Sequence, residues 1–144
     1  MKRAIDIILQ TLHVGECRRV VTLDINGKNL ARKFLEKLKK DDGRKWQLLV
    51  DRIENVSNFH SYENNQIFNF VGEGIYEFKR PGLRLYAFYD EIGDEHQLIL
   101  CTNGGKKNTK KEQQNDIRRA KAIKADYLAA KTSPEAQFTI KEQP

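Results

Sequence analysis

The sequence contains few of the residues that most often carry metal or covalent chemistry. Among its 144 residues there are 2 cysteines and 3 histidines. Cys17 and Cys101 are too far apart in sequence to form a metal knuckle, and two thiols are too few for a secreted disulfide framework. His13, His60 and His96 stand apart and form no His/Cys cluster. These absences disfavour a metal enzyme, and we expect no cofactor.

Long hydrophobic runs are also missing. The longest apolar run falls far short of the ~20 residues that a membrane-spanning helix needs. The N-terminus is similar to a short signal peptide, but Asp6 interrupts the apolar segment Ala4–Leu9. We therefore expect a cytoplasmic protein without membrane association. The length predicts a single domain, which we expect over residues 1–131, followed by a C-terminal tail at 132–144.

Positive charge is concentrated in one part of the chain. The 26 basic and 20 acidic residues give a net charge of +6. The stretch from Gly104 to Lys124 holds eight basic and two acidic residues, so it alone carries the whole excess. Such a concentration is typical of a surface that binds a polyanion, while a solvated helix face is the alternative. The eight basic residues are Lys106, Lys107, Lys110, Lys111, Arg118, Arg119, Lys121 and Lys124.

The spacing of apolar residues predicts three helices. Two of them, at about 29–40 and 46–58, are joined by Asp41-Asp42-Gly43 and form an αα-hairpin. The third begins at the capping box Thr109-Lys110-Lys111-Glu112 and ends near Ala130, with Ile117, Ala120, Ile123, Tyr127 and Leu128 facing the core. Residues 4–12 show helical spacing but are also compatible with a strand.

Short β-branched and alternating segments predict an antiparallel sheet. The expected strands are Cys17–Leu23, Ile75–Lys79, Leu83–Asp90 and Gln97–Cys101. Residues 60–70 read as a loop or a strand lead-in, and residues 137–141 as a possible edge strand. The expected fold class is α+β, with helices packed on one face of a small antiparallel sheet.

Cations and aromatic residues gather at the ends of these predicted strands. Alternation places Arg84, Tyr86 and Phe88 on one face of a strand. Lys79 and Arg80 end the neighbouring strand. Such groups can surround a phosphodiester, and metal-free RNA cleavage needs cations, a proton acceptor, a proton donor and a stacking surface. The alternatives are an Arg84 paired with Asp90 or Glu77, and aromatic residues that belong to the core.

Two segments together resemble a known family. Residues 74–90 read G-I-Y-E-F-K-R-P-G-L-R-L-Y-A-F-Y-D, and residues 117–128 read I-R-R-A-K-A-I-K-A-D-Y-L. They are similar to the RelE/ParE superfamily of toxins from bacterial type II toxin–antitoxin systems, near its HigB-like, phage-derived branch. The resemblance implies a RelE-like fold, in which an N-terminal αα-hairpin packs on a small antiparallel sheet with a C-terminal helix. It also implies a toxin that inhibits translation.

The same resemblance implies an activity and its partners. Members cleave mRNA as metal-independent endoribonucleases, often on the ribosome. A cognate antitoxin silences them, here expected to be a helix-turn-helix, HigA-like protein. The resemblance covers about residues 17–128, which it marks as the core of the expected domain, and the family core does not require residues 1–16. Two alternatives stay open: a ParE-like toxin that inhibits gyrase, and a catalytically inactive nucleic-acid-binding module of the same fold.

The resemblance also assigns candidate site residues. Arg84 matches the strand arginine that contacts the scissile phosphate, and Lys107 with Lys106 matches the basic position after the last core strand. Some members carry a catalytic tyrosine near the start of the last helix, where this chain has Lys110. The proton acceptor is therefore unassigned, with Lys110, Tyr86 and His60 as candidates. The expected RNA-binding residues are Lys79, Arg80, Tyr86, Lys111, Arg118 and Arg119.

Overall fold

The computed structural model describes residues 4–58, 68–92, 95–106 and 109–142. Over these residues the chain forms a seven-stranded sheet with the strand order β3-β4-β5-β6-β2-β1-β7. Three helices accompany the sheet. In chain order the elements are β1 (Ile5–Val14), β2 (Arg19–Ile25), α1 (Leu30–Asp41), α2 (Gly43–Ser57), β3 (Phe68–Gly72), β4 (Ile75–Arg80), β5 (Leu83–Ile92), β6 (Glu95–Lys106), α3 (Lys110–Lys131) and β7 (Ala136–Lys141).

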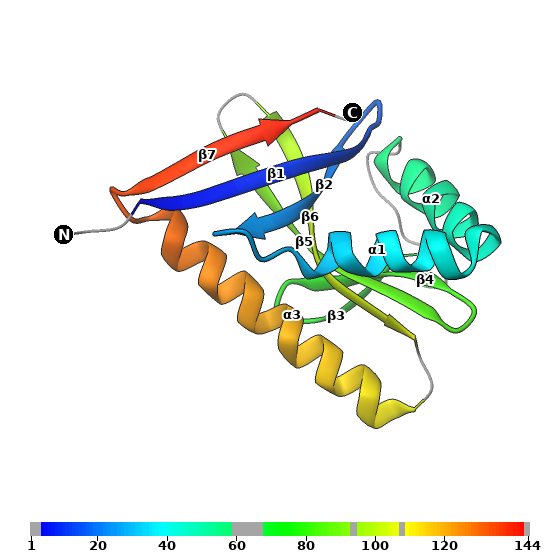
Figure 1. Cartoon of the computed structure of the whole chain (residues 1–144). Helices are drawn as coiled ribbons and strands as arrows, with labels where there is room; N and C mark the ends of the chain where they lie inside the picture. The colour runs from blue at the N-terminus through cyan, green and yellow to red at the C-terminus, as the bar shows by residue number, and fades with distance from the viewer. Residues whose placement is uncertain (1–3, 59–67, 93–94, 107–108, 143–144) are drawn as a thin grey trace.

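The sheet is mixed rather than antiparallel. Strands β3 to β6 form an antiparallel meander, and β1 and β2 form an antiparallel pair. Two parallel pairings join the parts of the sheet: β2 with β6, and β1 with β7. Strands β1 and β7, from opposite ends of the chain, lie side by side (Figure 1). The prediction of a small antiparallel sheet behind an N-terminal helical hairpin is therefore wrong, because two strands precede the helices and the sheet is larger.

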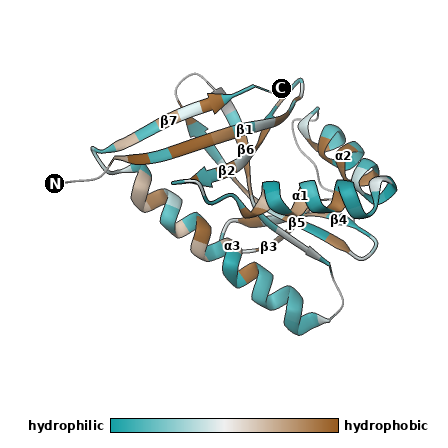
Figure 2. Cartoon of the chain, viewed as in Figure 1, coloured by the Kyte–Doolittle hydropathy of each residue, from teal (hydrophilic) through white to brown (hydrophobic). Residues whose placement is uncertain are grey.

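The first described segment, β1, is a strand, and the burial of its side chains alternates with a period of two. Ile7, Leu9 and Thr11 are buried, while their neighbours are less so. Residues with β-branched side chains favour the pleated, half-buried environment of a sheet over a helix. Figure 2 shows β1 as a mostly hydrophobic strand. Of the two interpretations of residues 4–12, the strand is correct.

Side-chain caps begin both helices of the hairpin, and the two helices meet at the predicted Asp41-Asp42-Gly43 junction. The Asn29 Oδ1 accepts a hydrogen bond of 3.0 Å from the backbone N–H of Arg32 at the start of α1. The Asp42 Oδ1 accepts one of 3.2 Å from the N–H of Lys45, so Asp42 ends α1 and caps α2. Each side chain satisfies an N–H that has no partner within its helix.

Helices cover both faces of the sheet. One core packs α1 and α2 against alternate residues of the strands, including Leu83, Leu85 and Ala87 of β5. The second core packs α3 on the other face, against Tyr86 and Phe88 of the same strand. We call these the hairpin face and the α3 face. The alternation predicted for β5 is confirmed, whereas the prediction that all helices share one face is wrong.

Helix α3 begins at its predicted cap. The Thr109 Oγ1 accepts a hydrogen bond of 3.1 Å from the N–H of Glu112. Ala120 and Tyr127 are buried against the sheet, as expected, but Leu128 is 45% exposed and lies outside the core. After α3, β7 adds an edge strand whose Phe138 packs against the same core. None of the described helices is long and apolar enough to span a membrane.

Candidate nucleic-acid interface at the strand ends

Three strands of the meander place their cationic ends together. Strand β4 ends where β5 begins, and β6 ends on the other side of β5 at the same end of the sheet. Lys79 is the direct partner of Arg84, and Leu83 lies between Arg80 and Lys106. Since neighbouring strands are about 4.8 Å apart, these residues belong to one small area. We call Lys79, Arg80, Arg84 and Lys106 the strand-end cations.

The pleat divides the strand-end cations between the two faces of the sheet. Arg84 and its partner Lys79 lie on the α3 face, because directly paired residues point the same way. Arg80 and Lys106 pair with Leu83, which belongs to the core under α1 and α2, so they lie on the hairpin face. The sequence predicted one cluster, and the structure places two cations on each side of the sheet end.

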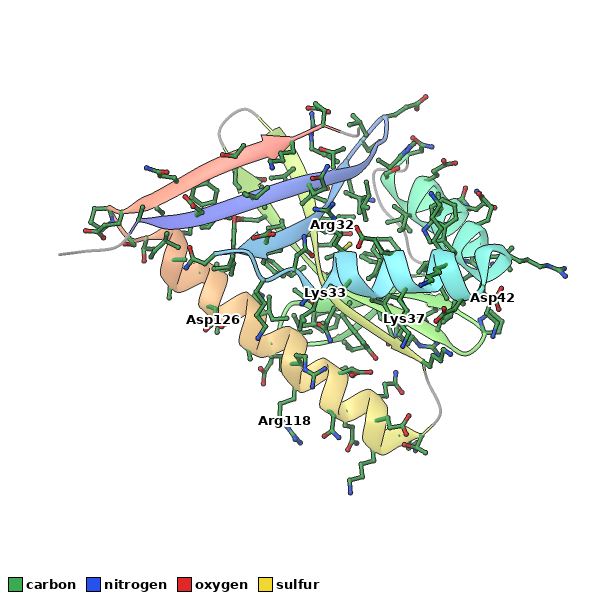
Figure 3. All side chains as sticks on the ribbon, viewed as in Figure 1. Arg32, Lys33, Lys37, Asp42, Arg118 and Asp126 are labelled. Atoms are coloured by element: carbon green, nitrogen blue, oxygen red, sulfur yellow. The ribbon has the colours of Figure 1, made fainter. Side chains whose placement is uncertain are left out.

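The hairpin side of this end is hollowed. A groove of about 430 Å³ lies between the second half of α1 and the end of β6. Three lysines line it, and Asp42 stands at the junction of α1 and α2 (Figure 3). The groove thus carries three lysines and two aspartates, and the Lys45 ammonium lies 4.0 Å from the Asp42 carboxylate. Its lining residues are Phe34, Lys37, Leu38, Asp41, Asp42, Lys45, Gly105 and Lys106.

The α3 side of this end holds a buried ion pair. Arg84 is 7% exposed and Glu77 is 2% exposed. The Arg84 Nε lies 3.5 Å from the Glu77 Oε2, and within the described chain this nitrogen has no hydrogen-bond acceptor. The guanidinium donates instead to two backbone oxygens of the β4–β5 turn, at 2.9 Å to Arg80 and 2.7 Å to Leu83. Arg84 is therefore paired with Glu77, one of the two alternatives that the sequence offered.

Helix α3 closes over this ion pair. The Gln113 side chain donates a hydrogen bond of 3.1 Å to the Glu77 Oε2. The Asn103 side chain donates one of 3.0 Å to the backbone oxygen of Asp116. Glu77, Arg84, Asn103, Gln113 and Asp116 thus form a polar cluster between the sheet and the first half of α3. We call it the polar cluster.

Tyr86 lies beside the polar cluster and is fully buried. Burial raises the pKa of its hydroxyl well above the usual value, and the nearby carboxylates of Glu77 and Asp116 raise the pKa further. A tyrosine with a raised pKa stays protonated at neutral pH, so Tyr86 is a poor proton acceptor. Its buried ring also offers no open face on which a base can stack.

A bulge and two glycines let both helices approach the end of β6. Tyr86 faces Asn103 and Ala87 faces Cys101, so Thr102 is the extra residue of a β-bulge. Beyond it a Cβ at Gly104 would overlap the ring of Phe34, and one at Gly105 would overlap the carboxylate of Asp116. Glycine is required here because α1 and α3 pack directly on the backbone of β6 from its two faces.

The remaining predicted site residues lie on α3 or outside the described chain. Lys110 and Lys111 are exposed in its first turn. Arg118 points away from the protein body (Figure 3), and the charge of Arg119 acts on the carboxylate of Asp116. Lys107 and His60 lie outside the described residues, so their predicted roles stay predictions.

Sequence reasoning missed two features of this region. Glu77 was considered only as a partner for Arg84, yet a charged residue at an inward position of a strand is itself a signal of a buried polar site. The second is another basic stretch: residues 28–45 hold eight basic and three acidic residues. Its charge was hidden because acidic residues elsewhere in the chain balance it. Within it, Lys33 and Lys37 lie one turn apart on α1 (Figure 3).

No model of a known protein family matches the sequence, and neither does any curated protein. The resemblance to the RelE/ParE superfamily therefore stays a prediction. Among the described residues, no group of three or more His, Cys, Asp and Glu side chains is placed to hold a metal ion.

Proposed function

We propose that this protein is an RNA-cleaving toxin that binds single-stranded RNA at its strand-end cations and acts in the bacterial cytoplasm on mRNA. The observation that carries the proposal is the gathering of Lys79, Arg80, Arg84 and Lys106 at one end of the sheet. RNA backbones are polyanions, and phosphate contacts from lysine and arginine supply a large share of the affinity for them.

The hairpin-side groove supports the RNA-binding step of this proposal. Lys37, Lys45 and Lys106 line it, and its volume of about 430 Å³ admits a nucleotide rather than a protein element. Phe34 adds an aromatic ring to the lining, and aromatic rings favour stacking with an unpaired base. Single-stranded RNA is therefore a better match for this surface than a duplex, whose bases are already stacked.

The proposed cleavage step is an intramolecular transfer of a phosphoryl group from the 5′-oxygen of one nucleotide to the 2′-oxygen of its neighbour. The 2′-oxygen of a ribose attacks the adjacent phosphorus, and the bond from phosphorus to the 5′-oxygen breaks. The 2′-hydroxyl proton passes to an acceptor, and another proton reaches the departing 5′-oxygen, leaving a 2′,3′-cyclic phosphate and a 5′-hydroxyl. The cations stabilise the charge that develops on the phosphate oxygens. In this scheme Lys106 and Arg80 contact the phosphate, because both lie on the hairpin side of the sheet end.

The pairing of Arg84 with Glu77 favours a second candidate function. A guanidinium that is 7% exposed and bound to two backbone oxygens must leave these partners before it can contact a phosphate. If Arg84 keeps its native contacts, the protein is a nucleic-acid-binding module without cleavage activity. The two candidates share the strand-end surface and differ only in the chemical step.

Purified protein and a labelled single-stranded RNA separate these candidates. We expect new fragments with 2′,3′-cyclic phosphate ends, formed equally with and without EDTA. Lys106→Gln should reduce both binding and cleavage about tenfold. Lys141→Gln is the matched control, since Lys141 is also an exposed lysine at the last position of a strand. Salt-dependent binding without cleavage would establish the binding module, and the absence of RNA binding would contradict both candidates.

A further inference from the structure

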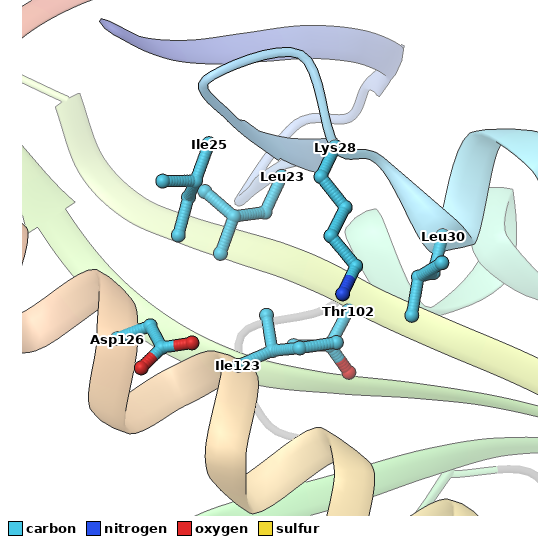
Figure 4. Close-up of a pocket in the computed structure, with 7 residues that line it drawn as sticks. All are labelled: Leu23, Ile25, Lys28, Leu30, Thr102, Ile123 and Asp126. Carbon is cyan, nitrogen blue, oxygen red and sulfur yellow. The ribbon is translucent and has the colours of Figure 1, made fainter. Parts of the chain in front are cut away.

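A second pocket lies where two parallel strands part. Strands β2 and β6 are parallel neighbours, and their carboxyl ends lead to helices on opposite faces of the sheet. From β2 the chain continues to α1 on the hairpin face, and from β6 it continues to α3 on the other face. Ligands of open sheets bind in the crevice that such a divergence opens beyond the carboxyl ends of the strands. A pocket of about 150 Å³ occupies this position (Figure 4).

The walls of this pocket are apolar and come from three elements. Leu23 belongs to β2, Leu30 to the first turn of α1, and Ile123 to α3. Pockets for drug-sized ligands measure about 300–1,000 Å³, so this one suits a single small ring system. Apolar walls on opposite sides favour a planar ring, because both of its faces are then removed from water.

Two opposite charges face each other across the pocket without touching. Lys28 enters from the β2–α1 loop and Asp126 from α3 (Figure 4). No ion pair joins them in the described part of the chain, and both side chains remain exposed. Thr102 lines the pocket too, but its hydroxyl bonds to the Asn103 Oδ1 at 2.8 Å. A ligand that joins the two charges must therefore offer acceptors to Lys28 and donors to Asp126.

We propose that this pocket binds a single guanine base of the RNA. The O6 and N7 atoms of guanine are acceptors for a lysine. Its N1–H and N2–H₂ groups are adjacent donors that match the two oxygens of a carboxylate. Adenine presents an amino group in place of O6 and an acceptor in place of N1–H. It would therefore place a donor opposite the Lys28 ammonium and an acceptor opposite the Asp126 carboxylate. The pocket therefore selects guanine over adenine.

The pocket and the hairpin-side groove are separate but share two elements, α1 and β6. Successive turns of α1 contribute Leu30 to the pocket and Phe34 and Lys37 to the groove. On β6, Thr102 lines the pocket and Lys106 lines the groove, and the backbones of these two residues are about 13 Å apart along the strand. The inference rests on the proposed function, since it assigns the base that a bound RNA places next to the strand ends.

Free nucleotides test the pocket separately from RNA. The amide NMR signals of ¹⁵N-labelled protein are followed during titration with 5′-GMP, which measures both the affinity and the place of binding. 5′-AMP is the control ligand, because it carries the same phosphate and ribose. We expect 5′-GMP to bind at least tenfold more tightly and to shift the amides of Leu23, Leu30 and Ile123. Asp126→Asn should weaken 5′-GMP about tenfold, because one carboxylate oxygen becomes a donor. Asp51→Asn, at an exposed helical aspartate of α2, is the control.

The possible outcomes separate this inference from the proposed function. Equal affinities for 5′-GMP and 5′-AMP, or an unchanged 5′-GMP affinity in Asp126→Asn, would overturn the guanine pocket. Guanine selectivity in a protein that neither binds nor cleaves RNA would keep the pocket and remove the proposed function. RNA cleavage without any preference for guanine near the cut would keep the function and remove the pocket.

Discussion

The two ends of α3 cover ion pairs of different character. Beneath its C-terminal half, Asp90 accepts a hydrogen bond of 2.8 Å from the Lys131 ammonium and another from the Tyr127 hydroxyl. Beneath its N-terminal half, Glu77 and Arg84 are more deeply buried but 3.5 Å apart. A buried pair with loose geometry recovers less of its desolvation cost than a close pair near solvent. The Asp90–Lys131 pair joins the helix to the sheet, whereas the Glu77–Arg84 pair lies within the sheet beside the strand ends.

The pKa values of two carboxylates near the two ends of α3, Asp90 and Asp116, also shift in opposite directions. At the C-terminal end, burial acts to raise the pKa of Asp90, but hydrogen bonds from Lys131 and Tyr127 outweigh it and lower the pKa. At the N-terminal end, burial raises the pKa of Asp116, and Glu112 adds to this while Arg119 opposes it. The charged form of Asp90, beneath the C-terminal half of α3, is thus stabilised, whereas the charged form of Asp116, within the first half of α3, is destabilised.

The largest expected effect on the comparison of the two ion pairs comes from removing one charge of the buried Glu77–Arg84 pair. Arg84→Ala should lower the free energy of unfolding by about 3–5 kcal/mol, because Glu77 is left buried and unpaired. Denaturant unfolding measures this loss. The double variant Glu77→Gln with Arg84→Met should recover most of it, since no charge remains buried. A single variant within 1 kcal/mol of wild type would show that the pair is not buried in solution.

The corresponding change at the other end of α3 should cost less. Lys131→Met should lower the free energy of unfolding by about 1 kcal/mol, because the lysine is one-third exposed and water replaces part of its contact with Asp90. The same denaturant experiment applies. A loss as large as that of Arg84→Ala would remove the distinction between the two pairs.

The two carboxylates should also give stability profiles of opposite sign. The folded pKa of Asp90 is lowered, so its contribution is present above the unfolded value near 3.9 and is lost as the pH falls through the folded value. The folded pKa of Asp116 is raised, so stability rises as the pH falls through that value. At pH 7 we expect Asp90→Asn to destabilise and Asp116→Asn to stabilise slightly. Unfolding measured from pH 3 to 7 tests both, and equal signs would contradict the contrast.

Local signals in the sequence predicted most of the elements correctly. The last helix is capped by Thr109 as predicted, and the helical hairpin turns at the predicted Asp41-Asp42-Gly43 junction, because capping residues and chain breaks are short-range signals that a single sequence reveals. The alternation along β5 also holds, since the period of a strand is set by its own backbone. The sheet pairings could not be predicted in this way. The parallel pair of β1 and β7 joins segments from opposite ends of the chain, and no local pattern specifies such a partner.

The sequence predicted which cations lie near the strand ends, but it did not predict how they are arranged there. Lys79, Arg80, Arg84 and Lys106 do meet at one end of the sheet. Their division between two faces depends on cross-strand register, which sequence patterns leave open. The pocket between β2 and α3 was not predicted, because it arises from the parallel pairing of β2 and β6.

The measurement that tests the central claim most directly is the mapping of mRNA 5′ ends in bacteria that express the protein. Cells with the wild type, Lys106→Gln or Lys141→Gln are compared after induction. The account predicts growth arrest with new 5′ ends inside translated mRNA for the wild type and Lys141→Gln, and about tenfold fewer ends for Lys106→Gln. Growth arrest with intact mRNA, or equal cleavage by both variants, would contradict it.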